Sequence, residues 1–160
     1  MKVGIGSDHN AFELQKEIIA FVESLGHEVM EYGEDASCQE IDYPGVAFQV
    51  GEAIISKEID RGILLCGTGL GMAIAASKVP GIRAATCHDT YSAERAQKSN
   101  NAQIITLGAK VIGIELAKQV IQKYLESTFP GGNSARKVQQ IIDKEKEYLK
   151  SKEDGHDSPK

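Results

Sequence analysis

The 160-residue sequence contains no tryptophan, only three cysteines and no apolar run approaching about 18 residues. The cysteines lie at positions 38, 66 and 87, so no CxxC pair indicates a zinc knuckle or a dithiol redox motif. We expect Cys38 and Cys87 to be small buried hydrophobic residues. Because the first dozen residues also lack a signal-peptide pattern, we expect a cytoplasmic protein without a membrane-spanning helix.

Positive charge is scarce as well, since 18 Lys and Arg stand against 23 Asp and Glu, a formal net charge of −5. Phosphate backbones require a basic face, so nucleic acid is not expected as the main partner, although a local basic patch could hold one small anion. The length suits one domain, which we assign to residues 1–150. Residues 151–160 form a polar tail that we expect to be disordered.

The apolar pattern predicts five strands that alternate with helices. Strands are predicted at the start of "MKVGIGSDH" and over 27–33, 62–66, 82–87 and 102–108, and helices over 11–25, 46–55, 72–78, 91–98, 112–125 and 134–150. Such alternation is typical of an α/β protein with a doubly wound parallel sheet covered by helices on both faces. The last helix follows Gly131 and Gly132 and resembles an arm. It could pack on a second subunit or, alternatively, on its own domain.

One stretch, "GILLCGTGLGMAIAASK" at 62–78, combines a buried strand, a cysteine and a glycine-rich turn at the start of a helix. Successive backbone N–H groups in such a turn form an anion-binding concavity, and the same field makes Cys66 a candidate thiolate. A phosphate-binding Walker loop and a cysteine phosphatase loop would require Lys or Arg where this chain has other residues. The GxGxxG dinucleotide fingerprint is absent too, because the spacing here is GxGxG.

Further polar residues follow the other predicted strands. Asp8 and His9 come after the first strand, His88 after the fourth and Lys110 after the fifth. Asp8, His9 and Cys66 are expected at one sheet edge, where open α/β sheets bind ligands, whereas His88 could instead belong to a helix cap around Asp89 and Thr90. On the last helix, Arg136 and Lys137 are candidate phosphate ligands or, alternatively, exposed helix-face charges.

A thiolate, an oxyanion-stabilising loop, a His–Asp pair and scattered cations suit proton abstraction next to a carbonyl, with an enediolate held by backbone amides. That reaction requires no cofactor, and no ligand spacing suggests a metal.

The segments "SDH", "DYP", "GILLCGTGLGMAIAASKVPGIRAA" and "SNNAQIITLGAKVIG" resemble the ribose-5-phosphate isomerase B / galactose-6-phosphate isomerase subunit family over about residues 1–150. The resemblance implies a Rossmann-like three-layer α/β sandwich with a five-stranded parallel sheet and a C-terminal helical arm. It also implies a homodimer, or a tetramer, with active sites at the subunit interface. The activity implied is cofactor-free aldose–ketose isomerisation of a sugar phosphate.

By position, the resemblance makes Cys66 the base that forms the enediol, with Thr68 as a polar partner of the reacting oxygens. Asp8 is expected as a third catalytic residue beside them. The positions expected to bind substrate, from the resemblance and from the candidates above, are His9, Tyr43, Gly67, Gly69, Leu70, Gly71, His88, Ser99, Asn100, Lys110, Arg136 and Lys137.

Two positions depart from the family pattern. Members of the family usually have "HN" before the fifth strand, and the resemblance implies that this histidine opens the sugar ring; this chain has Ser99–Asn100 there. Members also usually have "GGRH" with a later Arg, which binds phosphate, where this chain has "GGNSARK". Lys137 and Lys110 stand where Arg is common, and Lys is the poorer bidentate phosphate ligand. Arg136 could compensate.

The expected substrate is ribose 5-phosphate, the family's commonest. A tetrose 4-phosphate cannot close a furanose ring and would tolerate the loss of the histidine, unless His88 replaces it. A hexose 6-phosphate is a further alternative. From a different class, a non-catalytic sugar-phosphate-binding subunit would not need Cys66.

Overall fold

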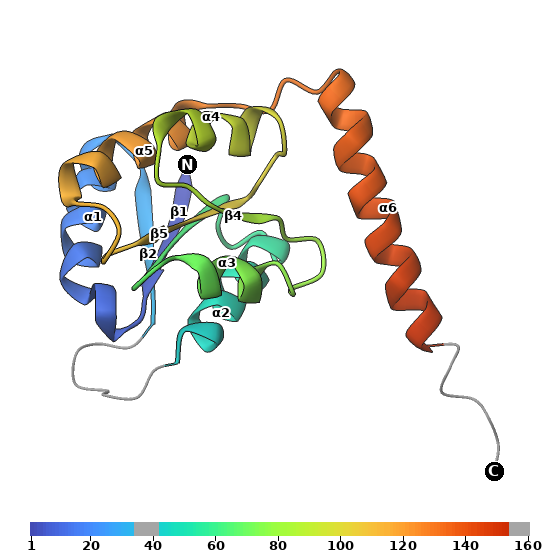
Figure 1. Ribbon diagram of the computed structural model, residues 1–160, viewed down its shortest axis with the longest axis horizontal. Helices are drawn as coiled ribbons and strands as arrows, with labels where there is room; N and C mark the ends of the chain where they lie inside the picture. The colour runs from blue at the N-terminus through green and yellow to red at the C-terminus, as the bar shows by residue number, and fades with distance from the viewer. Residues whose placement is uncertain (34–41, 154–160) are drawn as a thin grey trace, which may run out of the picture.

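The computed structural model describes residues 1–33 and 42–153. Along the chain the elements are β1 (Lys2–Ser7), the 3-10 turn η1 (His9–Ala11), α1 (Phe12–Ser24), β2 (Glu28–Tyr32), α2 (Tyr43–Ile55), β3 (Arg61–Cys66), α3 (Leu70–Ala76), β4 (Ala84–Thr86), α4 (Thr90–Lys98), β5 (Ile104–Gly108), α5 (Ile114–Glu126) and α6 (Asn133–Glu153), as Figure 1 shows. Cys38 lies outside the described residues.

The five strands form one parallel sheet in the order β2-β1-β3-β5-β4. The predicted parallel α/β fold is therefore confirmed. The chain leaves β1 toward one side of the sheet and returns to place β3 on the other. The boundary between β1 and β3 is thus the point at which the strand order reverses, and ligands of such sheets bind beyond the carboxyl ends of the strands at this point.

Helices cover both faces of the sheet and give the expected three layers (Figure 1). On one face, α1, α4 and α5 bury residues such as Ile18, Ala93 and Ile121 against the strands. On the other face, α2 and α3 bury Val50 and Met72. Cys87 is 1% exposed, which confirms its predicted place in the core.

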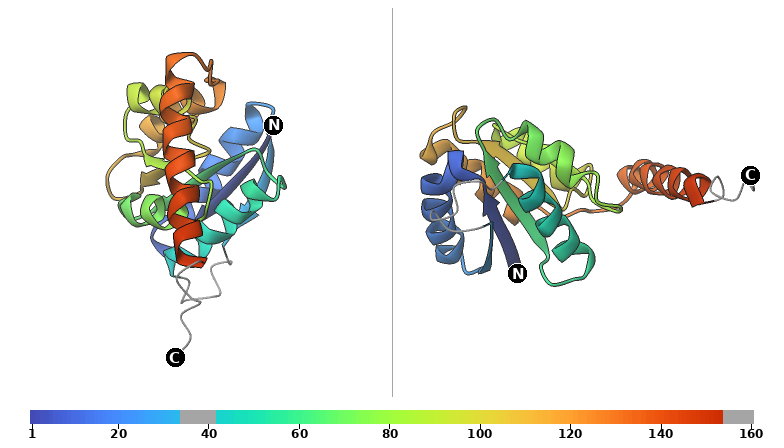
Figure 2. Two further views of the ribbon diagram at one scale, coloured as in Figure 1. Left: turned by 90° about the vertical axis from the view of Figure 1, so that its right-hand side faces the viewer. Right: turned by 90° about the horizontal axis from the view of Figure 1, so that it is seen from below.

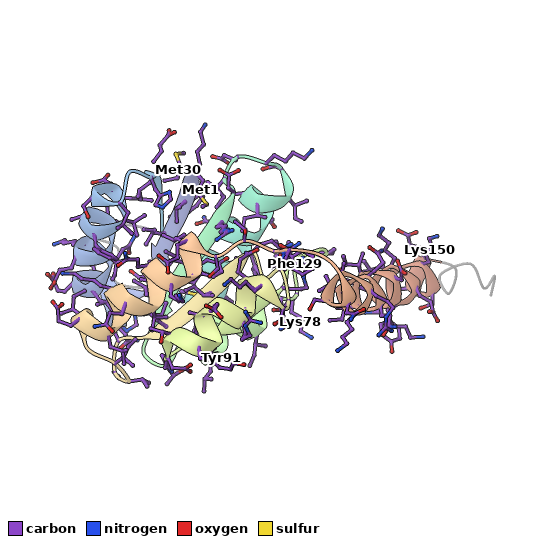
Figure 3. All side chains as sticks on the ribbon, turned by 90° about the horizontal axis from the view of Figure 1, so that it is seen from above. Met1, Met30, Lys78, Tyr91, Phe129 and Lys150 are labelled. Carbon is purple, nitrogen blue, oxygen red and sulfur yellow. The ribbon has the colours of Figure 1, made fainter. Side chains whose placement is uncertain are left out.

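Helix α6 projects from this layered body, as Figure 1 and the right-hand view of Figure 2 show. In Figure 3, Phe129 lies on the segment that leads to α6, and Lys150 lies near the far end of the helix. A hydrogen bond of 2.9 Å from the Gly81 N–H to Glu145 Oε2 links α6 to the body. Val138 is buried within the chain, so the helix packs in part on its own domain.

Helix α6 is mostly polar and charged, but it also carries three exposed large apolar residues. Ile141 is 57% exposed, Tyr148 62% and Leu149 42%. These side chains lie on the projecting helix and have no covering surface within the part of the chain that the structure describes. The expected arm therefore has both a contact with its own domain and an uncovered apolar face.

Several boundaries differ from the sequence-based expectation. Helix α6 continues to Glu153, so residues 151–153 of the predicted tail are helical; Lys150 and Lys152 in the last turn suit the negative end of the helix dipole. Helix α2 begins at Tyr43, with Pro44 in its first turn, where the fixed φ of proline is favourable. Of the helices within the described ranges, none combines the length and the apolar character needed to span a membrane.

Candidate active site

The carboxyl ends of β1, β3 and β5 bring several predicted site residues to one edge of the sheet. The Asp8 N–H, directly after β1, donates to the Leu65 carbonyl on β3 at 3.2 Å. Directly after β5, the Ala109 N–H donates to the Cys66 carbonyl at 2.8 Å and the Lys110 N–H to the Gly67 carbonyl at 3.0 Å. These backbone bonds set the Cys66 loop between the segments that carry Asp8 and Lys110.

Cys66 is the last residue of β3 and is 4% exposed. The Gly69 N–H donates to its Sγ at 3.0 Å, so the turn directs a backbone donor at the sulfur. Gly69 has φ +78°, and a Cβ at this position would stand 3.0 Å from the backbone carbon of Leu107. Only glycine combines that left-handed backbone with such close packing on β5.

The turn also holds backbone donors that are free to bind a ligand. Within residues 1–33 and 42–153, the N–H groups of Gly67, Thr68 and Gly71 have no acceptor. The Thr68 hydroxyl accepts the Leu70 N–H at 3.3 Å and keeps its own proton available for donation. The turn therefore presents amides and a hydroxyl next to Sγ, the arrangement that stabilises negative charge on an oxygen.

Two side chains from other elements border this turn. Tyr43, at the start of α2, lies against Gly71, where a Cβ would stand 2.6 Å from atoms of the tyrosine ring. The aliphatic stem of Lys110 lies beside Gly67, at 3.6 Å from Cδ to a Cβ built there. Lys110 is exposed as a residue, so its ammonium group can turn toward a bound anion.

Asp8 is 6% exposed and is held by Asn10. One carboxylate oxygen accepts the Asn10 N–H at 2.9 Å and the other accepts its Nδ2 at 3.2 Å. His9 is exposed in the η1 turn that follows. The rigid carboxylate and the accessible imidazole therefore lie at the same edge as Cys66.

His88 belongs to this edge and does not cap a helix. Its Nε2 accepts the Gly108 N–H at 2.9 Å, which fixes the ring at the end of β5 with the proton on Nδ1. The cap of α4 is Asp89, whose Oδ1 accepts the Ser92 N–H at 2.7 Å. This backbone hydrogen bond holds the pKa of Asp89 below its usual value.

The structure does not bring Ser99 and Asn100 to Cys66 within one chain. Both lie between α4 and β5, at the amino edge of the sheet, because the Gly62 N–H at the start of β3 donates to the Gln103 carbonyl. The length of β5 separates them from the Cys66 loop, roughly 15 Å at about 3.3 Å per residue.

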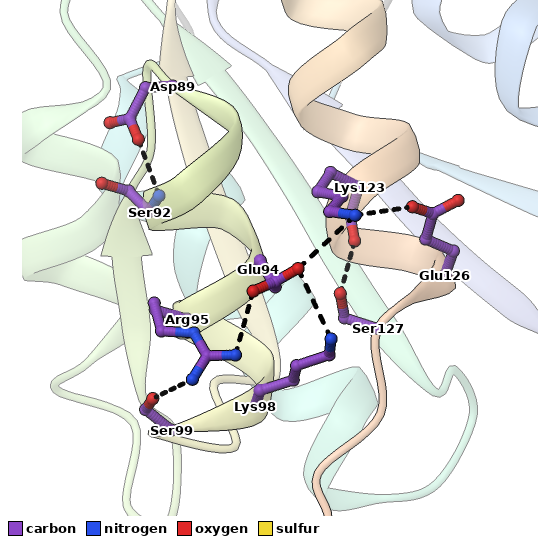
Figure 4. A network of polar contacts seen from close by, with 9 residues as sticks. All are labelled: Asp89, Ser92, Glu94, Arg95, Lys98, Ser99, Lys123, Glu126 and Ser127. Atoms are coloured by element: carbon purple, nitrogen blue, oxygen red, sulfur yellow. Dashed lines mark hydrogen bonds and ion pairs between the residues drawn. The ribbon is translucent and has the colours of Figure 1, made fainter.

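The surroundings of Ser99 are polar and charged, as Figure 4 shows. The Ser99 Oγ accepts from Arg95 Nη1 at 3.5 Å, and Arg95 Nη2 is paired with Glu94 at 3.0 Å. Glu94 also pairs with Lys98 and Lys123, each at 3.4 Å. The turn that carries Asn100 is held by Arg83, whose Nε donates to the Asn100 carbonyl at 3.0 Å.

Arg136 and Lys137 are also remote from the Cys66 loop of their own chain. They are exposed on the first turns of α6, which starts from the amino edge. There Arg61, on β3, donates to the carbonyls of Tyr124 and Ser127, each at 2.8 Å. The predicted residues thus fall into a group around Cys66 and a second group at the amino edge and on α6.

Sequence reasoning missed two threonines behind the Cys66 loop. Thr86 on β4 and Thr106 on β5 both lie within hydrogen-bonding distance of the Gly69 carbonyl, at 3.3 Å and 2.7 Å. The available signal was a polar residue in the otherwise apolar strand "IITLG".

As for metals, no group of three or more His, Cys, Asp or Glu side chains in the described ranges could hold an ion.

Comparisons with known proteins agree on one family. A family model described as Ribose/Galactose Isomerase matches residues 3–141. D-erythrulose-4-phosphate isomerase of Pectobacterium atrosepticum is 51% identical, covering 88% of this chain and 93% of its own. Ribose-5-phosphate isomerase B of Escherichia coli is 40% identical over the same shares. The solved Clostridium thermocellum ribose-5-phosphate isomerase B is 45% identical with a TM-score of 0.89, covering 92% of this chain and 99% of its own.

Proposed function

The chain belongs to the ribose/galactose isomerase family and is a sugar-phosphate isomerase, and we propose that it interconverts aldose and ketose through a cis-enediolate, with Cys66 as the base. The observation that carries the proposal is the position of Cys66 Sγ, 3.0 Å from the Gly69 amide, in the same turn as the Gly67, Thr68 and Gly71 N–H groups, which have no acceptor within residues 1–33 and 42–153. The proposed base and the candidate oxyanion donors therefore belong to one turn.

In the proposed reaction, the Cys66 thiolate removes the proton from C2 of the open-chain aldose, and the electron pair forms the C1–C2 double bond. Negative charge collects on the oxygen at C1, where the amides and the Thr68 hydroxyl stabilise it. The proton then returns to C1, and the hydroxyl proton at O2 moves to O1, which leaves the ketose. His9, Tyr43 and Lys110 surround the same loop as candidates for binding the hydroxyl and phosphate groups.

For the substrate we propose a tetrose 4-phosphate. A ribose ring must open before C2 becomes acidic, and ring opening needs an acid or base that Ser99, bonded to Arg95, does not provide at neutral pH. A tetrose 4-phosphate cannot form a furanose because its O4 is esterified. The 51% identical relative is named D-erythrulose-4-phosphate isomerase, which supports this choice.

Ribose 5-phosphate is the second candidate. The relatives from Listeria innocua, at 46% identity, and Escherichia coli are named for it. His88 also lies at the Cys66 edge, and within residues 1–33 and 42–153 its Nδ1 proton has no acceptor while Nε2 accepts the Gly108 N–H. His88 could open the ring in place of the histidine that Ser99 replaces.

We further propose a homodimer in which each site combines the two groups of residues. The Cys66 group of one subunit would meet Asn100, Arg136 and Lys137 of the other, which accounts for charged and amide groups that lie far from the sulfur in their own chain. The uncovered apolar residues of α6 would then lie in the subunit interface.

Because phosphorylated sugars do not cross membranes, the proposed compartment is the cytoplasm.

The experiment is a panel of tetrose 4-phosphates, pentose 5-phosphates and hexose 6-phosphates, each assayed in both directions for kcat/KM. We expect erythrose and erythrulose 4-phosphate to exceed ribose 5-phosphate by at least about tenfold, the discrimination that about 1.4 kcal/mol provides. The Ser99→His variant restores the family residue and should raise ribose activity relative to tetrose activity. A wild-type preference for ribose 5-phosphate would select the second candidate, and tight binding without turnover would indicate a non-catalytic subunit.

A further inference from the structure

Two threonines on neighbouring strands lie behind the Cys66 loop. Thr86 and Thr106 are register partners between β4 and β5, and their Oγ1 atoms are 2.9 Å apart. Thr106 is fully buried, and every other residue of β5 except its final glycine is apolar. A buried hydroxyl in such a strand requires a hydrogen-bond partner to offset the loss of water.

That partner is the carbonyl of Gly69. Thr106 Oγ1 donates to it at 2.7 Å, and Thr86 Oγ1 lies 3.3 Å from the same oxygen. Because the Thr106 proton is used in this bond, the Thr86 proton can be directed to Thr106 Oγ1 or to the carbonyl itself. The Ala73 N–H, in the first turn of α3, donates to the carbonyl as well, at 3.2 Å.

Gly69 is also the residue whose N–H donates to Cys66 Sγ. A glycine with φ +78° has many other conformations open to it. An anchor on its carbonyl restricts the rotation of the residue and therefore the direction in which its N–H points. The two hydroxyls thus act on the sulfur through one glycine, without touching either the sulfur or the volume in front of it.

We propose that Thr106, supported by Thr86, is a positioning residue for Cys66, which holds Gly69 in the left-handed conformation that directs its N–H at the sulfur. The inference rests on the proposed role of Cys66 as the base. If Thr106 holds Gly69 in this way, the Gly69 N–H orients the Cys66 sulfur and stabilises the negative charge of the thiolate before substrate binds. Substrate binding itself involves other groups, so kcat should depend on Thr106 more than KM does.

The test compares Thr106→Val, which removes the hydroxyl with little change of shape, with Thr106→Ser, which retains it. For Thr106→Val we expect kcat to fall roughly three- to tenfold, the effect of one net hydrogen bond, with KM within about twofold of wild type. Thr106→Ser should recover most of kcat, and Thr86→Val should lower it less than Thr106→Val. The substrate is the sugar phosphate that the panel identifies.

A second readout does not depend on activity. The Gly69 amide resonance, observed by NMR, should move and its hydrogen exchange should accelerate in Thr106→Val but not in Thr106→Ser. Ser127→Ala is the matched control, because it removes another buried hydroxyl, bonded to the Lys123 carbonyl at 2.7 Å, from the opposite edge of the sheet. It should leave both kcat and the Gly69 amide near their wild-type values.

An unchanged Gly69 amide in Thr106→Val would overturn the proposal, and so would an equal loss of kcat in Ser127→Ala. If the wild-type chain isomerises no sugar phosphate, the proposed function fails, and the Gly69 amide alone then decides whether Thr106 positions the turn.

Discussion

At the carboxyl edge of the sheet, one chain assembles Cys66, Asp8, His88 and Lys110 around a glycine turn, whereas Ser99 and Asn100 lie at the amino edge, remote from the Cys66 loop of their own chain. The first group is connected by hydrogen bonds within the chain, such as those from the Gly69 N–H to Sγ and from the Gly108 N–H to His88. In the second group, Arg83 donates to the Asn100 carbonyl and Arg95 to the Ser99 hydroxyl, whereas Arg136 and Lys137 are exposed on α6. This second group has no reacting atom nearby.

This difference indicates how work is divided in the proposed dimer. Groups that must touch the reacting carbons are fixed by the strand ends of one chain, where backbone geometry is most rigid. The groups proposed for the far end of the substrate, Asn100, Arg136 and Lys137, lie on a turn and on a projecting helix, so the proposed site needs a second subunit to place them beside a Cys66 loop. In the proposed dimer, the chemistry and the discrimination of substrate length would therefore be assigned to different subunits at each site.

The largest expected effect comes from removing the sulfur. Cys66→Ala should lower kcat by at least about a thousandfold, within the usual range for loss of a general base, because it removes the sulfur that is proposed to take the C2 proton and that accepts the Gly69 N–H. Binding of the sugar phosphate, measured by calorimetry, should change little. Substantial turnover by this variant would contradict the thiolate mechanism for the carboxyl-edge group.

A complementation experiment tests whether the two groups meet across subunits. Cys66→Ala lacks the base, and a variant with Asn100→Ala, Arg136→Ala and Lys137→Ala lacks the second group, so each homodimer should be nearly inactive. Unfolding and refolding the two together should restore up to about a quarter of wild-type activity. Half of the dimers are then mixed, and each mixed dimer has one intact site of two.

The control for this experiment is each variant refolded alone, which should regain nothing. If the mixture stays inactive while native mass spectrometry shows mixed dimers, the second group serves its own chain or no site at all. An active monomer in the wild type would exclude the shared site directly.

Much of the fold could be predicted from the sequence because its elements have strong local signals. The run "GILLC" is buried throughout in β3, and the glycine turn that follows it sets the left-handed residue needed beside Cys66. The order of the strands, with β5 between β3 and β4, could not be predicted, since periodicity carries no information about which strands pair.

The candidate site was predictable where residues follow a strand and unpredictable where contacts are long-range. Asp8 and Lys110 lie at the Cys66 edge as their positions after strands suggested. The role of Thr106 depends on contact with a carbonyl 37 positions away in the sequence. The contact between Glu145 and Gly81 spans 64 positions. Neither pairing leaves a local pattern in the chain.

The smallest expected effect is on the chemical reactivity of Cys87, the second cysteine at the carboxyl edge, which follows β4. Burial, with a smaller contribution from Asp89, raises the pKa of the Cys87 thiol to about 12. At pH 9 only about one thiol in a thousand would be ionised. Iodoacetamide should therefore label Cys66, with protection by sugar phosphate, and leave Cys87 unlabelled between pH 7 and 9, as peptide mass spectrometry would show.

The same shift links Cys87 to stability at alkaline pH. Between the ordinary thiol pKa, about 8.5, and about 12, the unfolded chain has lost this proton while the folded chain retains it. The free energy of unfolding should therefore fall as pH rises through this window, by at most about 1.4 kcal/mol per pH unit from this group. Denaturant titrations from pH 8 to 11 should show a shallower decline for Cys87→Ala than for wild type. Parallel declines would mean that Cys87 titrates alike in both states, and labelling of Cys87 at pH 8 would lead to the same conclusion.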